Sequence, residues 1–430
     1  MEALPTELRR QILSNCTPST LKSLRLTCHT WATIGFEYLL TPTFTTLPHR
    51  PDFARLLAVS QVPLFSQRLE TLSIKLGEIN EYHARHNSYF VQYMRDPDDR
   101  LAAQEQTWGA YAAFRDEKGK YMPSACSRAL LEPALKKLPN LRTVEVSLAT
   151  CPFPEIEEME LLRQIWNIPS TRLLPRASTM GRFKALLAAL AASPATISEL
   201  SHDRLPLEYF QQHHRTISIA CTVFKPLTSL SLTLDYADTS HGLDASPTFH
   251  NLCSCLRSAT LLQCMNLSFQ STQQQHQQLQ KIDISALFSS LSCFSLPLPS
   301  PSSFSSPSFN PLTLSPNPTF PALHALKLEG IACTENALVA FLAPHRHTLR
   351  RLQLGGEGVR APHQRANGGV RLLEGTWRGL VGRLRECLDL EGEGLVVQGD
   401  LVEGERRLWV RDEPWIVESL EGLELELDGV

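Results

Sequence analysis

Histidine is the side chain whose spacing in this sequence comes nearest to a metal site. His83 and His86 are three residues apart, so on a helix they would face the same side, near Glu81. Imidazole and carboxylate groups are ligands that zinc accepts. The segment is polar, and the pairs His213–His214 and His345–His347 offer no better arrangement. We therefore interpret these residues as surface or loop histidines and expect neither a metal nor a cofactor.

The cysteines predict buried thiols rather than a metal site or a disulfide framework. The chain has 11 of them, an odd number, and none forms a CxxC pair. Cys253, Cys255 and Cys264 lie close together but lack zinc spacing. Disulfide frameworks belong mainly to short secreted chains, so we expect reduced thiols.

Motifs that carry catalysis are absent from the sequence. There is no GxSxG, no GxxxxGK[ST], no GxGxxG after a predicted strand and no HExxH. We therefore predict a protein that is not an enzyme. The alternative is an enzyme whose site is assembled from scattered residues, which would appear in the fold as a pocket with perturbed ionisable groups.

Composition narrows the class of protein. The 430 residues are 43% hydrophobic, enough for a large core, and the formal charge is only -3. Neither a nucleic acid nor a membrane surface is an expected partner, because both require a clustered basic face. The first residues reach Arg9 and Arg10 without an apolar segment, so we expect no secretory signal. No stretch approaches the roughly 18 apolar residues of a spanning helix. We expect a cytoplasmic or nuclear protein.

Residues 4–40 predict three short helices. Thr6 can cap the first, and Leu8, Ile12 and Leu13 then fall on one face. Thr17 followed by Pro18 predicts the start of the second helix. So few residues cannot bury a full core alone, so their apolar faces need a partner or the rest of the chain.

Beyond Pro48 an LxxLxL pattern returns, and its last two apolar positions alternate as in a half-buried strand. The starts at 323 and 349 are 26 residues apart, within the period of leucine-rich repeats, and Leu338, Phe341 and Leu342 form a helix face between them. Longer gaps leave room for two or three units each. The copies are Leu69-Leu72-Ile74, Leu141-Val144-Val146, Leu227-Leu230-Leu232, Leu262-Met265-Leu267, Leu323-Leu326-Leu328, Leu349-Leu352-Leu354 and Leu420-Leu423-Leu425.

Three segments interrupt the repeats. Residues 78–122 are polar and aromatic and predict one or two inserted helices. Residues 271–319 are rich in glutamine, then in serine and proline, and predict a disordered loop, because this composition buries too little apolar surface. Residues 355–369 predict a glycine-rich loop.

The N-terminal segment resembles the F-box of fungal and other eukaryotic F-box proteins. The resemblance covers about forty residues and follows the order LPxEL, IL and LxxLRLxCxxW. It implies a three-helix motif that binds a Skp-type adaptor and, through it, a cullin-based ubiquitin ligase. In this sequence the motif positions are Leu4, Pro5, Leu8, Ile12, Leu13, Leu21, Leu24, Leu26, Cys28 and Trp31. The first five are expected in the adaptor interface, and the other five are expected to hold the helices together or to add to it.

The sequence predicts an α/β fold: an F-box at residues 1–42, followed by an irregular leucine-rich-repeat-like solenoid over residues 43–430. The repeats resemble the cysteine-containing leucine-rich repeats of many F-box proteins, in which they receive substrates. The resemblance implies a substrate-recognition subunit that brings an unknown protein target to the ubiquitin-conjugating enzyme. No cysteine stands in the Cys/His context of a ligase that carries ubiquitin itself.

Four alternatives stay open. The N-terminal helices could be only a cap on the solenoid, or the protein could bind a Skp-type adaptor as a scaffold outside ubiquitin ligation. Phosphate could also be recognised by arginines, although a solvated basic loop is the better interpretation: Arg350, Arg351, Arg360, Arg365 and Arg371. Trp377, Trp409 and Trp415, with the acidic end Glu418–Asp428, could form a docking surface, but core tryptophans are favoured.

Overall fold

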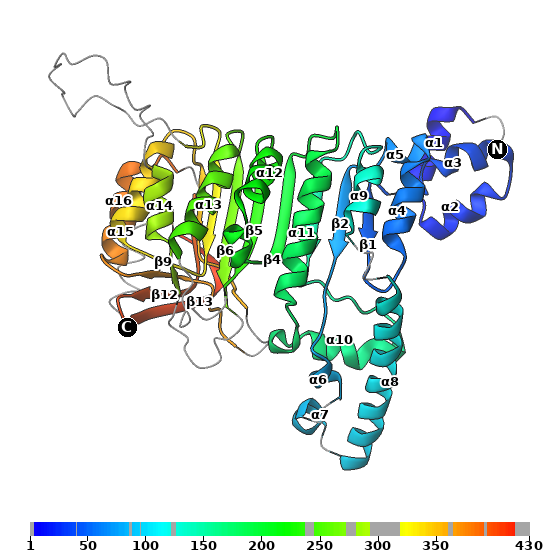
Figure 1. The fold of residues 1–430 in the computed structure, drawn as a ribbon, viewed down its shortest axis with the longest axis horizontal. Coiled ribbons are helices and arrows are strands. Elements are labelled where there is room, and N and C mark those ends of the chain that lie inside the picture. Colours follow the sequence, from blue (N-terminus) through cyan, green and yellow to red (C-terminus); the bar gives the residue numbers. More distant parts are fainter. Residues whose placement is uncertain are drawn as a thin grey trace.

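The protein is an elongated solenoid with a small helical domain at its N-terminal end (Figure 1). The computed structural model describes residues 4–39, 41–85, 88–94, 96–121, 126–236, 245–271, 281–292, 319–359, 364–390 and 394–417. The expected copy at Leu420, the acidic end and most of the predicted disordered loop 271–319 lie outside these residues. Within that loop, residues 281–292 are ordered, contrary to the prediction, because Ile284, Leu287 and Phe288 are apolar and pack into the core. Within them, no helix is both long and apolar enough to cross a membrane.

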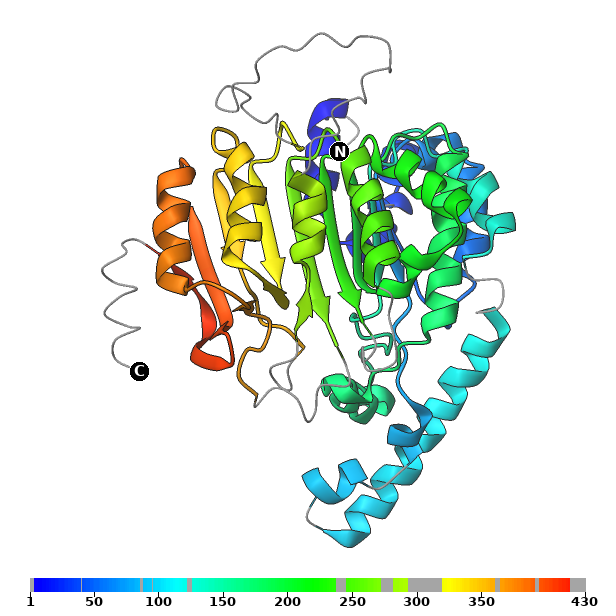
Figure 2. The ribbon, with the colours of Figure 1, turned by 60° about the vertical axis from the view of Figure 1, so that its left-hand side comes forward.

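A parallel sheet runs the length of the molecule, with strand following strand in chain order. Its main row is β1 (Thr43–Thr46), β2 (Thr71–Lys75), β3 (Thr143–Ser147), β4 (Glu199–Pro206), β5 (Ser229–Asp235), β6 (Cys264–Gln270), β8 (Ala325–Glu329), β10 (Arg351–Leu354) and β12 (Leu395–Glu403). The strand arrows point the same way (Figure 2). This is the α/β leucine-rich-repeat-like architecture that the sequence predicts.

Six of the seven predicted LxxLxL copies lie in the described residues, and each coincides with a strand of the main row. Equivalent positions pair across the sheet: Leu230 is opposite Met265, and Met265 is opposite Leu326. The side chains of all six copies are buried and form one continuous core. The repeat pattern therefore predicts which face of each strand is buried.

The long gaps left room for two or three units each, and the first gap holds only one: between β2 and β3 the chain adds helices and no strand to the main row. The second gap holds two units, because β4 lies between β3 and β5. One unit, β4, was missed between the second and third copies. Its motif reads Ile197, Leu200 and His202, so a histidine stands where the pattern needs an apolar residue.

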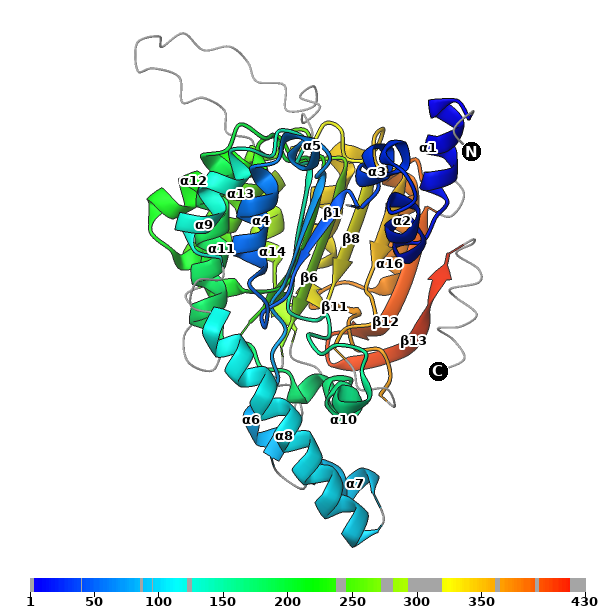
Figure 3. The ribbon, with the colours of Figure 1, turned by 90° about the vertical axis from the view of Figure 1, so that its right-hand side faces the viewer.

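One helix per unit covers one face of the sheet, and each helix packs on the next. The order is α4 (Asp52–Ser60), α9 (Arg128–Leu135), α11 (Arg176–Ala191), α12 (His214–Phe224), α13 (Ala245–Ser258), α14 (Ser285–Ser292), α15 (Glu335–Leu342) and α16 (Trp377–Cys387). Figure 3 looks along the solenoid and shows α4 and α9 on one side of β1. The opposite face, called the open face below, carries none of these helices.

The C-terminal units add a second, shorter row of parallel strands. β7 (Ile282–Asp283), β9 (Ile331–Cys333) and β11 (Val370–Leu372) pair in that order and join the end of β12. Gly330 makes the turn from β8 into β9 with φ of 69°, where a Cβ atom would lie 2.0 Å from the Phe269 carbonyl oxygen. β13 (Arg406–Ile416) then pairs antiparallel with β12 and closes this end of the sheet.

A helical insert projects from the solenoid beyond the carboxyl ends of the strands (Figures 1 and 3). It contains α6 (Glu81–Arg85), α7 (Ser88–Tyr93) and α8 (Pro97–Tyr121), and α10 (Glu160–Trp166) packs against it. Tyr111, Phe114, Phe153 and Trp166 form its separate core. The described part of the interruption at residues 78–122 is therefore helical, as predicted, and shares its core with the segment that holds α10.

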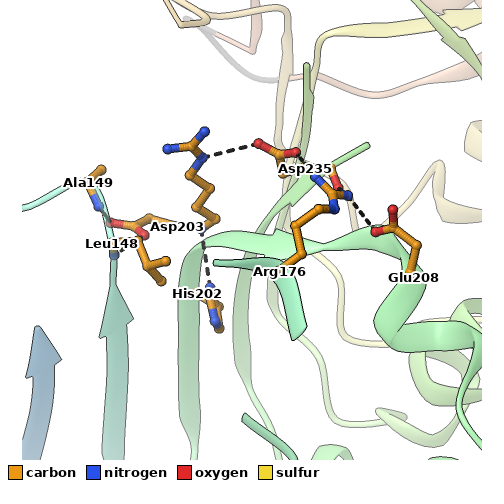
Figure 4. Close-up of polar contacts among 8 residues, drawn as sticks. Leu148, Ala149, Arg176, His202, Asp203, Glu208 and Asp235 are labelled. Atoms are coloured by element: carbon orange, nitrogen blue, oxygen red, sulfur yellow. Dashed lines mark hydrogen bonds and ion pairs between the residues drawn. The ribbon is translucent and has the colours of Figure 1, made fainter. Parts of the chain in front are cut away.

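A buried polar network ties the carboxyl ends of β3, β4 and β5 together (Figure 4). The Asp203 carboxylate accepts from the backbone N–H groups of Leu148 at 2.7 Å and Ala149 at 3.1 Å. Asp235 accepts from Arg204 Nε at 3.1 Å and also pairs with Arg176. Burial raises the pKa of Asp203 despite these hydrogen bonds. The network satisfies polar groups where the regular ladder ends.

Candidate interaction surfaces

The three N-terminal helices pack around a small core of their own. They are α1 (Thr6–Ser14), α2 (Pro18–Arg25) and α3 (His29–Phe36). Leu13, Leu21, Trp31 and Ile34 are at most 8% exposed and contact one another. Four such side chains are few for an independent domain, so this unit needs external support.

The helix starts follow the sequence only in part. Thr17 caps α2 as predicted, accepting from the backbone N–H of Thr20 at 3.3 Å, with Pro18 in the first turn. The prediction for Thr6 was wrong. Thr6 is the first helical residue of α1, and Pro5 occupies the N-cap position without a side-chain hydrogen bond. A proline there already holds φ near its helical value and leaves no role for the threonine.

Apolar side chains on the outside of this unit form its candidate binding face. Leu8 is 46% exposed and Ile12 is 42% exposed, and they lie one turn apart on α1, with Pro5 exposed at the start of that helix. Leu26, at the end of α2, is 89% exposed. Exposed leucine and isoleucine at helical spacing are typical of a surface that a partner covers.

The remaining motif residues lie between core and surface. Leu4, Leu24 and Cys28 are half-buried against the central cluster. Leu13 was expected in the interface but lies in the core, at 1% exposure, because α1 turns it toward Trp31. Leu26 was expected to hold the helices together or to add to the interface, and it is 89% exposed after the last turn of α2.

A junction fixes the three-helix unit to the first units of the solenoid. The rings of Phe36 and Phe65 lie with their centres 4.6 Å apart, and Arg25 stacks over Phe36. Arg68 pairs with the Glu37 carboxylate at 2.9 Å and also donates to the Glu37 carbonyl oxygen. The sequence analysis missed this junction, because its residues belong to no repeat or motif.

Comparison with protein families identifies this unit. Residues 1–34 match the family described as F-box domain. The chain carries an F-box domain at its N-terminal end. F-box domains bind Skp-type adaptors in cullin-based ubiquitin ligases, and F-box proteins are in general non-catalytic adaptors of these complexes.

The other comparisons add little. A comparison with curated proteins gives no significant match. Among solved structures, the leucine-rich repeat-containing protein LegL7 from Legionella pneumophila aligns with 12% identity over 91% of this chain and 98% of its own. The TM-score of 0.29 is too low to carry an argument, so the repeat architecture rests on the strands and helices described above.

The open face is the second candidate surface, and it is polar. Its outward positions hold mainly hydroxyl and amide side chains, with Glu145 and Glu199 on the N-terminal half and Lys327 and Arg351 on the C-terminal half. A hollow of about 180 Å³ lies where β5, β6, β8 and β10 meet. Its polar lining consists of Ser229, Ser231, Cys264, Asn266, Lys327, Arg351 and Gln353.

No nucleophile in this hollow is activated. Cys264 Sγ lies 3.5 Å from His324 Nε2, an approach that the sequence did not indicate. Burial raises the pKa of the Cys264 thiol, and Glu199 adds to that rise, so at neutral pH the thiol stays protonated. The hollow can form hydrogen bonds and ion pairs, and its cysteine is not prepared for attack.

The predicted metal candidates are not brought together. Within the described residues, no group of three or more His, Cys, Asp or Glu side chains could hold a metal ion. His83 is half-buried, and burial lowers its pKa, while His86 lies outside the described residues. His345 is buried beside the Phe341 carbonyl oxygen, at 3.1 Å, and His347 is exposed.

Most of the candidate tryptophans and arginines pack or form hydrogen bonds within the C-terminal units. Trp377 is fully buried, and its ring nitrogen donates to the Val402 carbonyl oxygen at 3.2 Å. Trp409 and Trp415 pack edge to face in the closing strand, with Arg411 stacked on both. Of the five candidate phosphate-binding arginines, Arg350, Arg365 and Arg371 hydrogen-bond to other parts of the chain, Arg351 lines the hollow and Arg360 is not described.

Proposed function

We propose that this protein is the substrate-recognition subunit of a Skp–cullin–F-box ubiquitin ligase. The F-box holds the Skp-type adaptor and, through it, the cullin, while the open face of the solenoid holds a protein target. The chain performs no bond chemistry. It raises the local concentration of target lysines near the activated ubiquitin. The place of action is the cytoplasm, the nucleus or both.

One observation carries this proposal: the F-box match coincides with a folded three-helix unit whose outer face is apolar and open. Pro5, Leu8, Ile12 and Leu26 would be covered by the adaptor. Each buried aliphatic side chain would contribute about 1.5–3 kcal/mol to binding.

The junction and the open face support the second half of the proposal. Phe36, Phe65, Glu37 and Arg68 hold the F-box against the solenoid, so a bound target would keep a defined distance from the adaptor. The open face presents hydrogen-bonding side chains on a rigid sheet, and Lys327 and Arg351 beside its hollow suit an acidic element of the target.

The test is a pull-down of purified adaptor and cullin by the full-length chain. Changing Leu8→Asp and Ile12→Asp together should lower the adaptor affinity on the order of a hundred- to a thousandfold, because two apolar contacts are replaced by charges. Both side chains are exposed in the free protein, so the variant should keep its circular dichroism spectrum.

The matched control changes two exposed leucines far from the F-box, Leu101→Asp and Leu261→Asp, and should bind the adaptor as the wild type does. If both double variants lost adaptor binding, the loss could not be assigned to the F-box face. Adaptor recovered without cullin would overturn the ligase role in favour of a scaffold outside ubiquitin ligation. No adaptor binding by the wild type would reduce the helices to a cap on the solenoid.

A further inference from the structure

Two thiols from neighbouring units meet on the helical face of the solenoid. Cys221 lies on α12 and Cys255 on α13, and their sulfur atoms are 3.9 Å apart. These helices follow β4 and β5, so 34 residues of chain separate the two cysteines. The Cys221 thiol donates a hydrogen bond to Cys255 Sγ. A disulfide would require the sulfurs to approach from 3.9 Å to about 2 Å.

The two thiols differ in access to solvent. Cys221 is half-buried, whereas Cys255 is fully buried under Leu252, Leu256 and the neighbouring helix. A small oxidant can therefore reach Cys221 first. Cys255 is buried beside it, with its sulfur 3.9 Å from Cys221 Sγ.

The ionisation of the pair has the same asymmetry. A hydrogen bond from Cys255 stabilises the Cys221 thiolate and lowers the pKa of Cys221, against the effect of burial. The same hydrogen bond and burial raise the pKa of Cys255. In the neutral pair Cys221 donates, and once Cys221 loses its proton Cys255 must donate instead. Cys221 is thus the nucleophile, and Cys255 is the thiol that completes the bond.

We propose that Cys221 and Cys255 form a reversible disulfide when the protein meets a peroxide, linking α12 to α13. The Cys221 thiolate attacks one peroxide oxygen and becomes a sulfenic acid, and the released hydroxide takes up a proton as water. Cys255 then loses its proton and attacks the sulfenic sulfur, expelling hydroxide, which leaves as a second water. Two thiols and one hydrogen peroxide give one disulfide and two water molecules.

Other described cysteines lack this combination of access and partner. Cys126 and Cys333 are buried, and burial raises the pKa of each thiol to about 12, so neither reacts as a thiolate. Cys387 is half-buried at the end of α16, on a different helix from the pair. Because intracellular disulfides in most organisms are transient, a bond at Cys221–Cys255 would act as a redox-dependent lock on the middle of the solenoid.

The test uses the purified full-length chain treated with hydrogen peroxide and then with N-ethylmaleimide. Digestion without reductant should yield one peptide pair joined through Cys221 and Cys255, and dithiothreitol should remove it. Because the bond closes a loop of 34 residues in the unfolded chain, oxidation should also raise the thermal midpoint by a few degrees.

Three variants separate this disulfide from general oxidation. Cys221→Ser should abolish the joined peptide and the thermal shift, and Cys387→Ser should keep both. A Cys255→Ser variant, which keeps a hydrogen-bond donor beside Cys221, should accumulate the sulfenic acid at Cys221, detected with dimedone, which a protein that has merely misfolded would not do selectively. Recovery of Cys221 as a singly oxidised residue in the wild type, with Cys255 still alkylated, would overturn the proposal.

Discussion

His202 interrupts the leucine ladder, and its replacement gives a direct measure of what that interruption costs. The imidazole lies between Val146 and Leu232 of the neighbouring strands, with its edge toward the ring of Phe183 at 5.1 Å. Nδ1 accepts from the backbone N–H of Arg204 at 3.2 Å, so the neutral ring carries its proton on Nε2, which has no partner among the described residues. Burial lowers the pKa of His202 from 6.5 to about 3.

The sign of the pH effect follows from this depressed pKa. The folded protein holds the ring neutral, while the unfolded chain takes up a proton below its pKa of 6.5, so stability falls as the pH drops from 6.5 toward 3. About pH 5 is roughly 1.5 units below the pKa of the ring in the unfolded chain. At 1.36 kcal/mol per unit, protonation of the unfolded chain lowers the free energy of unfolding by about 2 kcal/mol. At about pH 7.5 the cost is close to zero.

Changing His202→Leu restores the apolar pattern and removes this titration. At neutral pH the variant loses the hydrogen bond from the Arg204 N–H, which lowers stability, and it also loses the unpaired Nε2–H, which raises stability. The two effects are of similar size. At about pH 5 the variant should be about 2 kcal/mol more stable, relative to wild type, than it is at about pH 7.5.

The assay is urea unfolding followed by circular dichroism, with wild type and variant compared at both pH values. His250→Leu, a change at an exposed histidine of α13, is the control and should show no such difference. An equal stability difference between His202→Leu and wild type at the two pH values would refute the reasoning, because it would mean that the buried ring titrates as it does in the unfolded chain.

Two further predictions concern the C-terminal units. Gly330→Ala should lower stability by several kcal/mol, because its Cβ would lie 2.0 Å from the Phe269 carbonyl oxygen in a backbone with φ of 69°, whereas Gly109→Ala, in open space on α8, should raise it by about 0.5–1 kcal/mol; thermal unfolding of both variants tests this. Lys281→Met should cost about 3–5 kcal/mol in urea unfolding, because it leaves Asp400, 1% exposed and paired at 2.7 Å, as an unpaired buried charge. Adding Asp400→Asn should recover part of this loss, and no recovery would place the cost in packing.

Much of the architecture could be predicted from the amino-acid order. An LxxLxL copy is a local pattern, and its apolar alternation determines both that a strand forms and which of its faces is covered. The F-box motif is equally local, and its three helices, with the cap at Thr17, follow from nearby residues. Local signals of this kind need no knowledge of what lies across the fold.

Other features depended on contacts between residues far apart in sequence. β4 escaped notice because His202 breaks its pattern, whereas its pairing with β3 and β5 and the contact of His202 with Phe183 appear only in the fold. Whether Leu13 or Leu26 faces outward depends on how α1 and α2 turn against Trp31. The junction of Phe36 with Phe65 and the meeting of Cys221 with Cys255 arise because the solenoid lays successive units side by side. Spacing along the sequence does not predict such contacts, because they depend on how the units pack in the tertiary structure.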